Sequence, residues 1–439
     1  MTRLGALVHY PLALWIPLAL AGCAGGAAPP HEVRFWAMGR EGEVVQQLMP
    51  TFEARHPGVR VRVQQVPWSA AHEKLLTAFV GNAMPDVFQL GSTWVPEFHA
   101  IGALAPLDTR LDGPTPAQLD DYFGGILDAN RIAGGIYGIP WYVDTRVLFY
   151  RTDLLAQAGF AAPPADWAAW MASMAAVQHL VGSGRYAMLL PVREWQPLVI
   201  LALQSGATLL RDGDRYGDFQ SAAFRTAFAF YLDIFRRGLA PVEAEGQIAN
   251  LYQDFAAGFF AFYISGPWNL GEFAARLPAD MAGRWSTAPM PAPTGDGPGI
   301  SVAGGASLAL SPGARDPDTA WQLVEYLSEP ATQVSFYRLT GDLPARRSAW
   351  DDPALADNSH ARAFWTQLQH LQSPPKIPEW ERVAGKIADY ADAAVRGDLT
   401  LDAALAALDR DVDALLEKRR WLLARRAAPP PDAGHPAGS

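Results

Sequence analysis

The stretch VRFWAMGREGEVVQQLMPTFEARHPGVRVRV, residues 33–63, decides the fold class. Its first residues, 33–36, have the apolar character of a short strand, and residues 43–56 then place apolar side chains on one face of a helix. A His-Pro-Gly turn at 56–58 ends that helix, and the VRVRV of 59–63 alternates as a half-buried strand does. A strand, a helix and a second strand in this order predict a parallel βαβ unit.

The same alternation continues along the chain. Residues 70–80 have helical spacing, and a Pro-Asp pair at 85–86 opens a third strand at 87–90. Further helical patterns cover residues 167–180, 222–237, 317–327 and 401–416. The sequence therefore predicts an α/β fold in which helices flank the sheets and a ligand lies beyond the carboxyl ends of the strands.

Length and composition indicate more than one core. The chain has 439 residues, half of them apolar and 18% charged, which exceeds what a single core usually organises. The formal charge of −10, without a block of Lys and Arg, argues against nucleic acid as a partner. The single cysteine excludes a disulfide framework and a thiolate metal cluster.

The first residues have the pattern of an export signal. Arg3 precedes an uncharged apolar run at 4–21, and Leu-Ala-Gly-Cys at 20–23 is followed by small residues at 24–30. This arrangement resembles the lipobox of bacterial lipoproteins, which implies cleavage before Cys23 and acylation of that residue. The expected location is then the periplasm, on the extracytoplasmic face of a membrane. An uncleaved anchor helix with a free cysteine is the alternative interpretation.

Motifs of common catalytic sites are missing from the sequence. It contains no His-Glu-x-x-His, no Walker loop, no Gly-x-Gly-x-x-Gly after a strand and no Gly-x-Ser-x-Gly. No metal site or cofactor is expected, and the chain is expected not to be an enzyme. A pair of glycosidase carboxylates is not excluded by the sequence, so a lipid-anchored glycoside-active enzyme stays open as an alternative.

Tryptophans in loops are the most informative feature of the rest of the chain. Of the 15 tryptophans, several lie beside Gly or Pro: Trp36, Trp68, Trp94, Trp141, Trp195, Trp268 and Trp380. An indole face suits the apolar face of a sugar ring, and nearby polar groups can bond to its hydroxyls. Together they favour a carbohydrate ligand.

From about residue 32 to about 420 the chain resembles the extracellular solute-binding proteins of the sugar-transport type, the family of maltose-binding protein. The resemblance rests on a series of segments in order: the opening segment, "GNAMPDVFQLGSTWVPEFHAIGALAPLD", "IYGIPWYVDTRVLFYRTDLLAQAGF", "FYISGPWNL", "SVAGGASLALS" and "TGDLPARRS". It implies two α/β lobes that close on a sugar, and a monomeric receptor that delivers it to the permease of an ABC importer.

Site residues are carried over from the family where the local sequence matches. The resemblance implies ligand contacts from Arg40, Glu41, Gln89, Ser92, Thr93, Trp94, Trp141, Tyr142, Asp144, Glu194, Trp195, Trp268, Gly304, Gly305, Arg346 and Trp380. The family's maltose receptor has an Asp-Lys pair where this chain has Arg40 and Glu41, so the charge of that position differs. Trp268, in "FYISGPWNL", matches a stacking tryptophan.

The domain organisation follows from the same resemblance. The prediction is a signal peptide at 1–22, an acylated linker at 23–31, a first lobe at 32–143 plus 290–340, a second lobe at 144–289 plus 341–425, and a disordered tail at 426–439.

The expected ligand is a neutral α-linked disaccharide such as maltose or trehalose. A glycerol-phosphate-type ligand is the alternative, for which Arg40, Arg146 or Arg193 would bind the phosphate.

Overall fold

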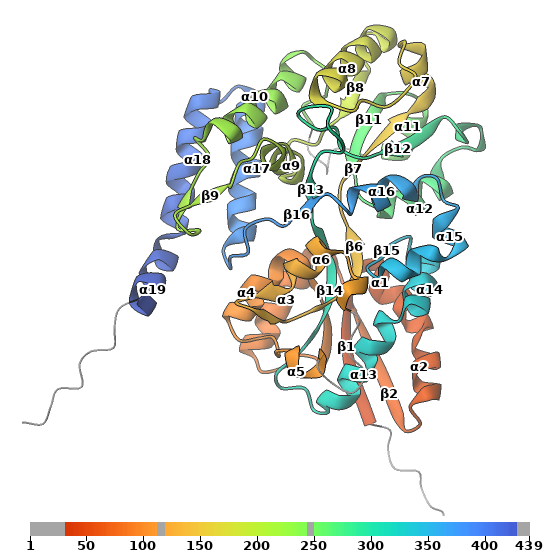
Figure 1. Cartoon of the computed structure of the whole chain (residues 1–439), viewed down its shortest axis with the longest axis vertical. Coiled ribbons are helices and arrows are strands. Elements are labelled where there is room, and N and C mark those ends of the chain that lie inside the picture. The colour runs from red at the N-terminus through yellow and green to blue at the C-terminus, as the bar shows by residue number, and fades with distance from the viewer. Residues whose placement is uncertain (1–30, 112–118, 244–249, 428–439) are drawn as a thin grey trace, which may run out of the picture.

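Two separate β-sheets form the framework of the computed structural model, which describes residues 31–111, 119–243 and 250–427 (Figure 1). The first sheet contains, in spatial order, β15 (Leu343–Pro344), β6 (Ile139–Asp144), β14 (Gly304–Leu310), β3 (Val87–Gly91), β1 (His31–Met38) and β2 (Val59–Val66). The second contains β12 (Trp285–Ala288), β7 (Val147–Arg151), β11 (Phe260–Ser265) and β8 (Tyr186–Leu189). We call the sheets with their helices the first and second lobes.

The predicted βαβ pairing is present in the first lobe. β1 lies between β2 and β3 and runs parallel to both, with Phe35 paired to Val63 on one side and to Val87 on the other. β14 adds antiparallel to β3, and β6 and β15 follow antiparallel in turn. The carboxyl ends of β1, β2 and β3 therefore meet at one edge of the sheet.

Helices of the first lobe cover both faces of its sheet. They are α1 (Gly39–Val44), η1 (Val45–Gln47), α2 (Met49–Arg55), α3 (Trp68–Val80), η2 (Ser92–Trp94), α4 (Val95–Ala100), α5 (Asp108–Leu111), η3 (Leu119–Asp121), α6 (Gly124–Ala129), α13 (Pro317–Ser328), α14 (Pro330–Thr340), η6 (Arg347–Asp351) and α15 (Pro353–Ala356). Phe35 packs on the same side as Phe52 of α2, whereas Met38 faces Leu75 of α3. This alternation along β1 buries both faces of the sheet.

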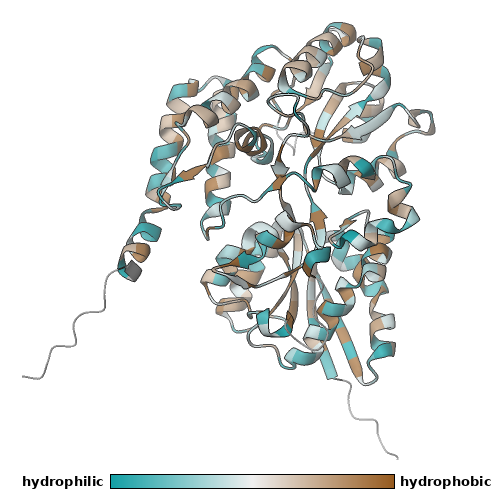
Figure 2. Cartoon of the chain, viewed as in Figure 1, coloured by the Kyte–Doolittle hydropathy of each residue, from teal (hydrophilic) through white to brown (hydrophobic). Residues whose placement is uncertain are grey.

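The longest helices belong to the second lobe. The helices of this lobe are α7 (Thr152–Gln157), α8 (Trp167–Val181), α9 (Gln196–Gln204), α10 (Ala222–Arg236), α11 (Leu251–Ala256), α12 (Trp268–Arg276), η5 (Ala279–Met281), α16 (Ala361–Gln367), α17 (Trp380–Arg396), α18 (Leu401–Leu415) and α19 (Glu417–Ala427). Three short pairs complete the structure: β4 (Arg131–Ile132) with β5 (Gly135–Ile136), β9 (Leu210–Arg211) with β10 (Tyr216–Gly217), and β13 (Ser301–Val302) with β16 (Leu371–Gln372). Helix α9 is brown in Figure 2, and all its residues from Pro197 to Leu203 are buried.

The chain passes between the lobes near residues 144–147 and again near 302–304, where β6 leads into β7 and β13 into β14. A third passage follows α15, because α16 packs on β12 of the second sheet. Among the described residues, no helix combines the length and apolar character needed to cross a membrane.

The structure differs from the sequence prediction in three places. The helix expected at 43–56 is divided into α1, η1 and α2, because Pro50 in the first turn of α2 has no N–H to continue the earlier helix. The Pro/Gly-rich segment expected to begin the return to the first lobe at 290 pairs instead with Ala165 and Trp167 of the second lobe. β15, expected in the second lobe, joins the first sheet because Gly341 (φ 86°) ends α14 and turns the chain back onto β6.

Candidate functional site

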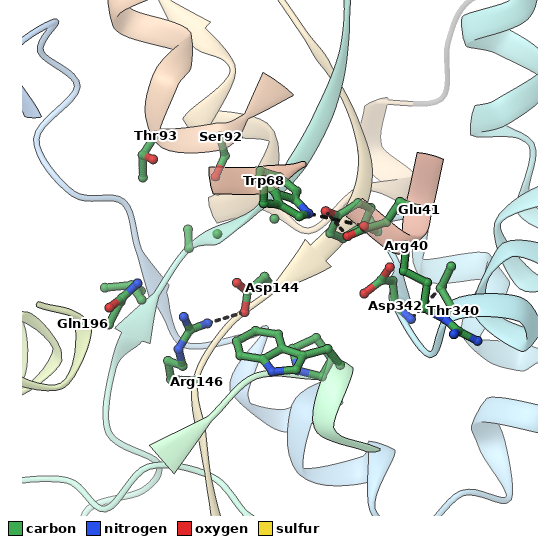
Figure 3. A pocket seen from close by; sticks show the side chains of 18 of the residues that line it. Arg40, Glu41, Trp68, Ser92, Thr93, Asp144, Arg146, Gln196, Thr340 and Asp342 are labelled. Atoms are coloured by element: carbon green, nitrogen blue, oxygen red, sulfur yellow. Dashed lines mark hydrogen bonds and ion pairs between the residues drawn. The ribbon is translucent and has the colours of Figure 1, made fainter. Parts of the chain in front are cut away.

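A cavity of about 820 Å³ lies between the two lobes. Its lining residues come from α1, α3, η2, β6 and β14 on the first lobe and from α9, α11 and α12 on the second, and Glu381 at the start of α17 completes it. Figure 3 shows these side chains converging on one space. The sequence prediction of a site beyond the strand ends agrees with this position.

Three parallel strands deliver the first-lobe residues. β1 ends at Met38, directly before Arg40 and Glu41, and β2 ends two residues before Trp68. β3 ends at Gly91, directly before Ser92, Thr93 and Trp94, which also line the cavity.

A buried hydrogen-bond chain orients Glu41. The Tyr142 hydroxyl donates to Oε1 of Glu41 at 2.9 Å and accepts from Nε2 of Gln89 at 3.0 Å. Gln89 is fixed in turn because its Oε1 accepts the backbone N–H of Met38 at 2.7 Å. Gln89 therefore positions the site from behind, since it is fully buried and does not line the cavity.

Gly39 allows Trp68 to approach Glu41. The Trp68 Nε1–H donates to Oε2 of Glu41 at 3.3 Å. Gly39 has φ 51°, and a Cβ at that position would lie 2.6 Å from Cδ1 of Trp68. A side chain there would therefore push Trp68 away from the carboxylate.

The second-lobe wall is built around Trp268. The guanidinium carbon of Arg146 lies 4.6 Å from the centroid of the Trp268 ring, and Nη1 of Arg146 donates to Oδ1 of Asp144 at 2.6 Å. Burial lowers the pKa of Arg146, but the charges of Asp144 and Glu194 outweigh this effect and raise it. Arg146 is therefore a fixed cation between the carboxylate of one lobe and the indole of the other.

Gly266, two residues before Trp268, allows the Trp268 ring to take its position. A Cβ on Gly266 would lie 1.8 Å from Cζ3 of Trp268, so only glycine lets the ring fold back at this turn. The ring is nevertheless 38% exposed, which is high for a large aromatic side chain at the wall of a cavity. It is available for contact with a ligand.

Two buried carboxyl groups face the cavity from the first lobe. Burial raises the pKa of Glu41, and burial together with the charge of Glu41 raises the pKa of Asp342 well above its usual range. Glu381 at the start of α17 also has a pKa raised by burial, and its Oε1 accepts the Thr93 hydroxyl at 2.5 Å. The cavity thus presents carboxyl groups of low hydration, which accept hydrogen bonds when ionised and can also donate one when protonated.

We expect Asp342→Asn to stabilise the protein at pH 8. The folded state binds the Asp342 proton more tightly than the unfolded chain, so its contribution to stability is complete below a pH of about 4 and is lost as pH rises through the raised pKa. At pH 8 the variant should gain about 1 kcal/mol or more in the free energy of unfolding, and the gain should shrink toward pH 5. Urea unfolding at several pH values measures it, and an equal gain at every pH would contradict it.

The structure brings eleven of the sixteen predicted contact residues to the cavity: Arg40, Glu41, Ser92, Thr93, Trp94, Tyr142, Asp144, Trp195, Trp268, Gly304 and Gly305. The backbone of Gly305 also requires a residue without a side chain. Its φ is 115°, and a Cβ would lie 2.3 Å from the carbonyl oxygen of Tyr142, where β14 and β6 pair.

Five predicted contacts lie elsewhere, Gln89 among them. Trp141 is fully buried and stacks on Phe336 at 4.4 Å, at a point where the pairing of β6 with β14 shifts register. Trp380 is buried in the second-lobe core, edge-on to Trp195.

The last two of these five predicted contact residues, Arg346 and Glu194, are charged. Arg346 donates from Nε to Oδ2 of Asp121 at 2.6 Å, in the first lobe and away from the cavity. Glu194 is not among the residues that line the cavity, and its charge raises the pKa of Arg146.

Several lining residues were missed by the carried-over set: Trp68, Arg146, Gln196, Tyr252, Glu272, Arg276, Thr340, Asp342 and Glu381. The Pro67-Trp68 pair after the second strand is a usable signal for Trp68. Asp342 carries none, because α14 and its glycine cap bring it to the site from a distant part of the sequence.

Among residues 31–111, 119–243 and 250–427, no group of three or more His, Cys, Asp or Glu side chains is arranged to hold a metal ion. The predicted acylation site Cys23 and signal peptide, and most of the predicted tail, lie outside the described residues.

Two α/β lobes around a cavity lined by aromatic and carboxylate side chains define a two-lobe solute-binding protein. The chain belongs to the bacterial extracellular solute-binding protein family, whose sequence model matches residues 37–334.

Solved relatives have the same architecture. The sugar-binding protein MalE of Xanthomonas citri is 46% identical, with a TM-score of 0.86 over 90% of this chain and 99% of that one. The GacH receptor of Streptomyces glaucescens, solved unliganded and with acarbose, is 26% identical, with a TM-score of 0.76 over 88% and 99% of the two chains. A relative found by sequence alone, the diacetylchitobiose-binding protein DasA of Streptomyces coelicolor, is 25% identical over 362 residues, 81% of this chain and 83% of DasA.

Proposed function

We propose that this protein is the sugar-binding component of an ABC-type importer. It captures a neutral sugar, for which an α-linked disaccharide such as maltose or trehalose is the specific expectation, and delivers it as a monomer to the membrane permease. The observation that carries the proposal is the set of four tryptophans on the cavity wall, Trp68 and Trp94 from one lobe and Trp195 and Trp268 from the other. Family membership and the sugar-binding relatives support it.

The chemistry of the wall suits a polyhydroxylated ring. Indole faces cover the apolar face of a sugar, while the carboxyl groups of Glu41, Asp144 and Asp342 can form hydrogen bonds with its hydroxyls. A dissociation constant of about 1 µM requires roughly 8 kcal/mol, which a few stacked rings and charge-assisted hydrogen bonds can supply. Binding of this kind requires no general acid or nucleophile.

The site is less suited to a phosphate. Arg146 is already paired with Asp144, and Nη2 of Arg40 donates to the carbonyl oxygen of Leu339. Arg193 pairs with Asp389 outside the cavity. Arg276, the third arginine of the cavity wall, pairs with Glu272. Each arginine of the wall therefore already bonds to an acceptor within the protein, which leaves them less suited to hold a phosphate together.

Calorimetric titration tests the proposal. The chain from residue 24 keeps every element that the structure describes and would be titrated with maltose, trehalose, glucose, a glycerophosphodiester and an amino acid. Micromolar one-to-one binding of a disaccharide that is recovered unchanged supports the proposal. Binding of the phosphodiester alone would overturn the sugar assignment, and conversion of the sugar to a product would favour the enzyme alternative.

We also propose that Cys23 carries the lipid that holds the protein at the extracytoplasmic face of a membrane. The Cys23→Ser variant should lose incorporation of labelled fatty acid, because acylation requires the thiol. Fatty-acid labelling followed by cell fractionation measures this. Equal labelling of the variant and the wild type would contradict the assignment.

A further inference from the structure

Helix α19, the last helix that the structure describes, has an unusual charge. Its sequence, EKRRWLLARRA, contains five Lys or Arg residues and one acid, whereas the whole chain carries a net charge of −10. Figure 1 shows α19 projecting from the end of α18, away from both sheets. It is therefore a compact basic element on an acidic protein.

One face of α19 is attached to the second lobe. The Arg419 Nε–H donates to the carbonyl oxygen of Asp214 at 2.9 Å, and Nη1 of Arg420 donates to that of Arg215 at 3.0 Å. Both acceptors lie in the turn between β9 and β10. These two arginines fix the rotation of the helix about its axis.

The opposite face consists of Lys418, Trp421, Leu422 and Arg425, and we call these four residues the outer face. They follow one another at the i, i+3, i+4, i+7 spacing of a single helix side. Trp421 is 54% exposed and Leu422 40%, among the most exposed large apolar side chains of the described residues. The guanidinium carbon of Arg425 lies 4.6 Å from the centroid of the Trp421 ring.

We propose that the outer face of α19 binds the surface of an anionic lipid bilayer. Tryptophan and leucine beside cations are the combination that enters the headgroup region, where the indole lies among the headgroups and the cations meet lipid phosphates. The charge of α19 is complementary to such a surface, and the rest of the chain is repelled by it. The interaction goes beyond solute capture and does not depend on which solute the cavity binds.

The geometry is compatible with a chain held at a membrane. The linker from Cys23 to the start of β1 spans at most about 30 Å when extended, which limits how far the first lobe can move from the bilayer. In Figure 1 the axis of α19 runs toward the same end of the molecule at which β1 begins. A lipid contact at α19 would add a second attachment and restrain the orientation of the lobes above the membrane.

Vesicle co-sedimentation tests this proposal. The chain from residue 24 removes the influence of the acyl anchor and would be mixed with vesicles of phosphatidylglycerol and phosphatidylcholine, or of phosphatidylcholine alone. We expect binding to the anionic vesicles only, and loss of it at about 0.5 M NaCl, where charges are screened within a few ångströms. The Lys418→Gln/Arg425→Gln variant should bind at least about tenfold more weakly.

Two further variants separate this contact from a general charge effect. Arg237→Gln/Arg284→Gln removes two exposed cations from elsewhere on the second lobe and should bind vesicles as the wild type does. Trp421→Ala/Leu422→Ala should weaken binding with all charges retained. Absence of binding to the anionic vesicles, equal binding to neutral vesicles, or equal losses in the α19 and control charge variants would each overturn the proposal. Circular dichroism checks that every variant is folded.

Discussion

Replacing Trp268 by alanine should reduce sugar affinity about thirtyfold or more. Its ring lies on the second-lobe wall, and its 38% exposure leaves a face free for the ligand. Loss of a tryptophan at the centre of a binding site costs about 2 kcal/mol or more, and 2 kcal/mol corresponds to a factor of roughly 30 in the dissociation constant. Arg146 also loses the ring that it covers at 4.6 Å, so its side chain becomes less restrained.

Calorimetry with the best sugar from the panel measures the effect, and Trp421→Ala is the matched control. Trp421 is 54% exposed and does not line the cavity, so its removal should leave the dissociation constant unchanged. Because Trp268 is partly exposed and lies at a cavity, the free energy of unfolding of the variant should change much less than its affinity. Unchanged affinity in Trp268→Ala would remove the stacking role from this residue.

The fold was predictable from local patterns because each pattern was complete within a short stretch. The βαβ unit from β1 to β3 needed only alternating valines, one helical face and the turn at 56–58. The place where the chain returns to the first lobe was not predictable in this way. It depends on pairing of residues 290–302 with distant parts of the second lobe, and on a glycine cap that directs β15 to β6.

The candidate site was also predictable only in part from the sequence. Residues that directly follow strands, such as Glu41 and Thr93, were carried over from the family where the local sequence matches, and the ends of β1 and β3 bring them to the cavity. Trp141 was predicted to contact the ligand because it lies between Pro140 and Tyr142 in the sequence, and this prediction was wrong. β14 pairs Ala306 with Tyr142 but Ser307 with Pro140, so Trp141 has no partner in the register, and its ring packs on Phe336 beside that of Tyr142. A pattern of regular alternation does not show such an irregularity. Asp342 was missed because no local pattern of the sequence indicates that this carboxyl group is buried in the folded chain.

Trp141→Ala should therefore lower stability rather than affinity. Trp141 is fully buried between Phe35 and Phe336, and removal of such a side chain costs about 3–5 kcal/mol in the free energy of unfolding. Among the described residues its Nε1–H has no hydrogen-bond partner, so Trp141→Phe keeps the aromatic contact, removes an unsatisfied donor and should cost less than the alanine variant. Urea unfolding measures both variants, and calorimetry of the folded fraction should give a dissociation constant near that of the wild type. A large loss of affinity with unchanged stability would restore Trp141 to the ligand contacts, because a side chain that only fills the core acts on binding through the folded population alone.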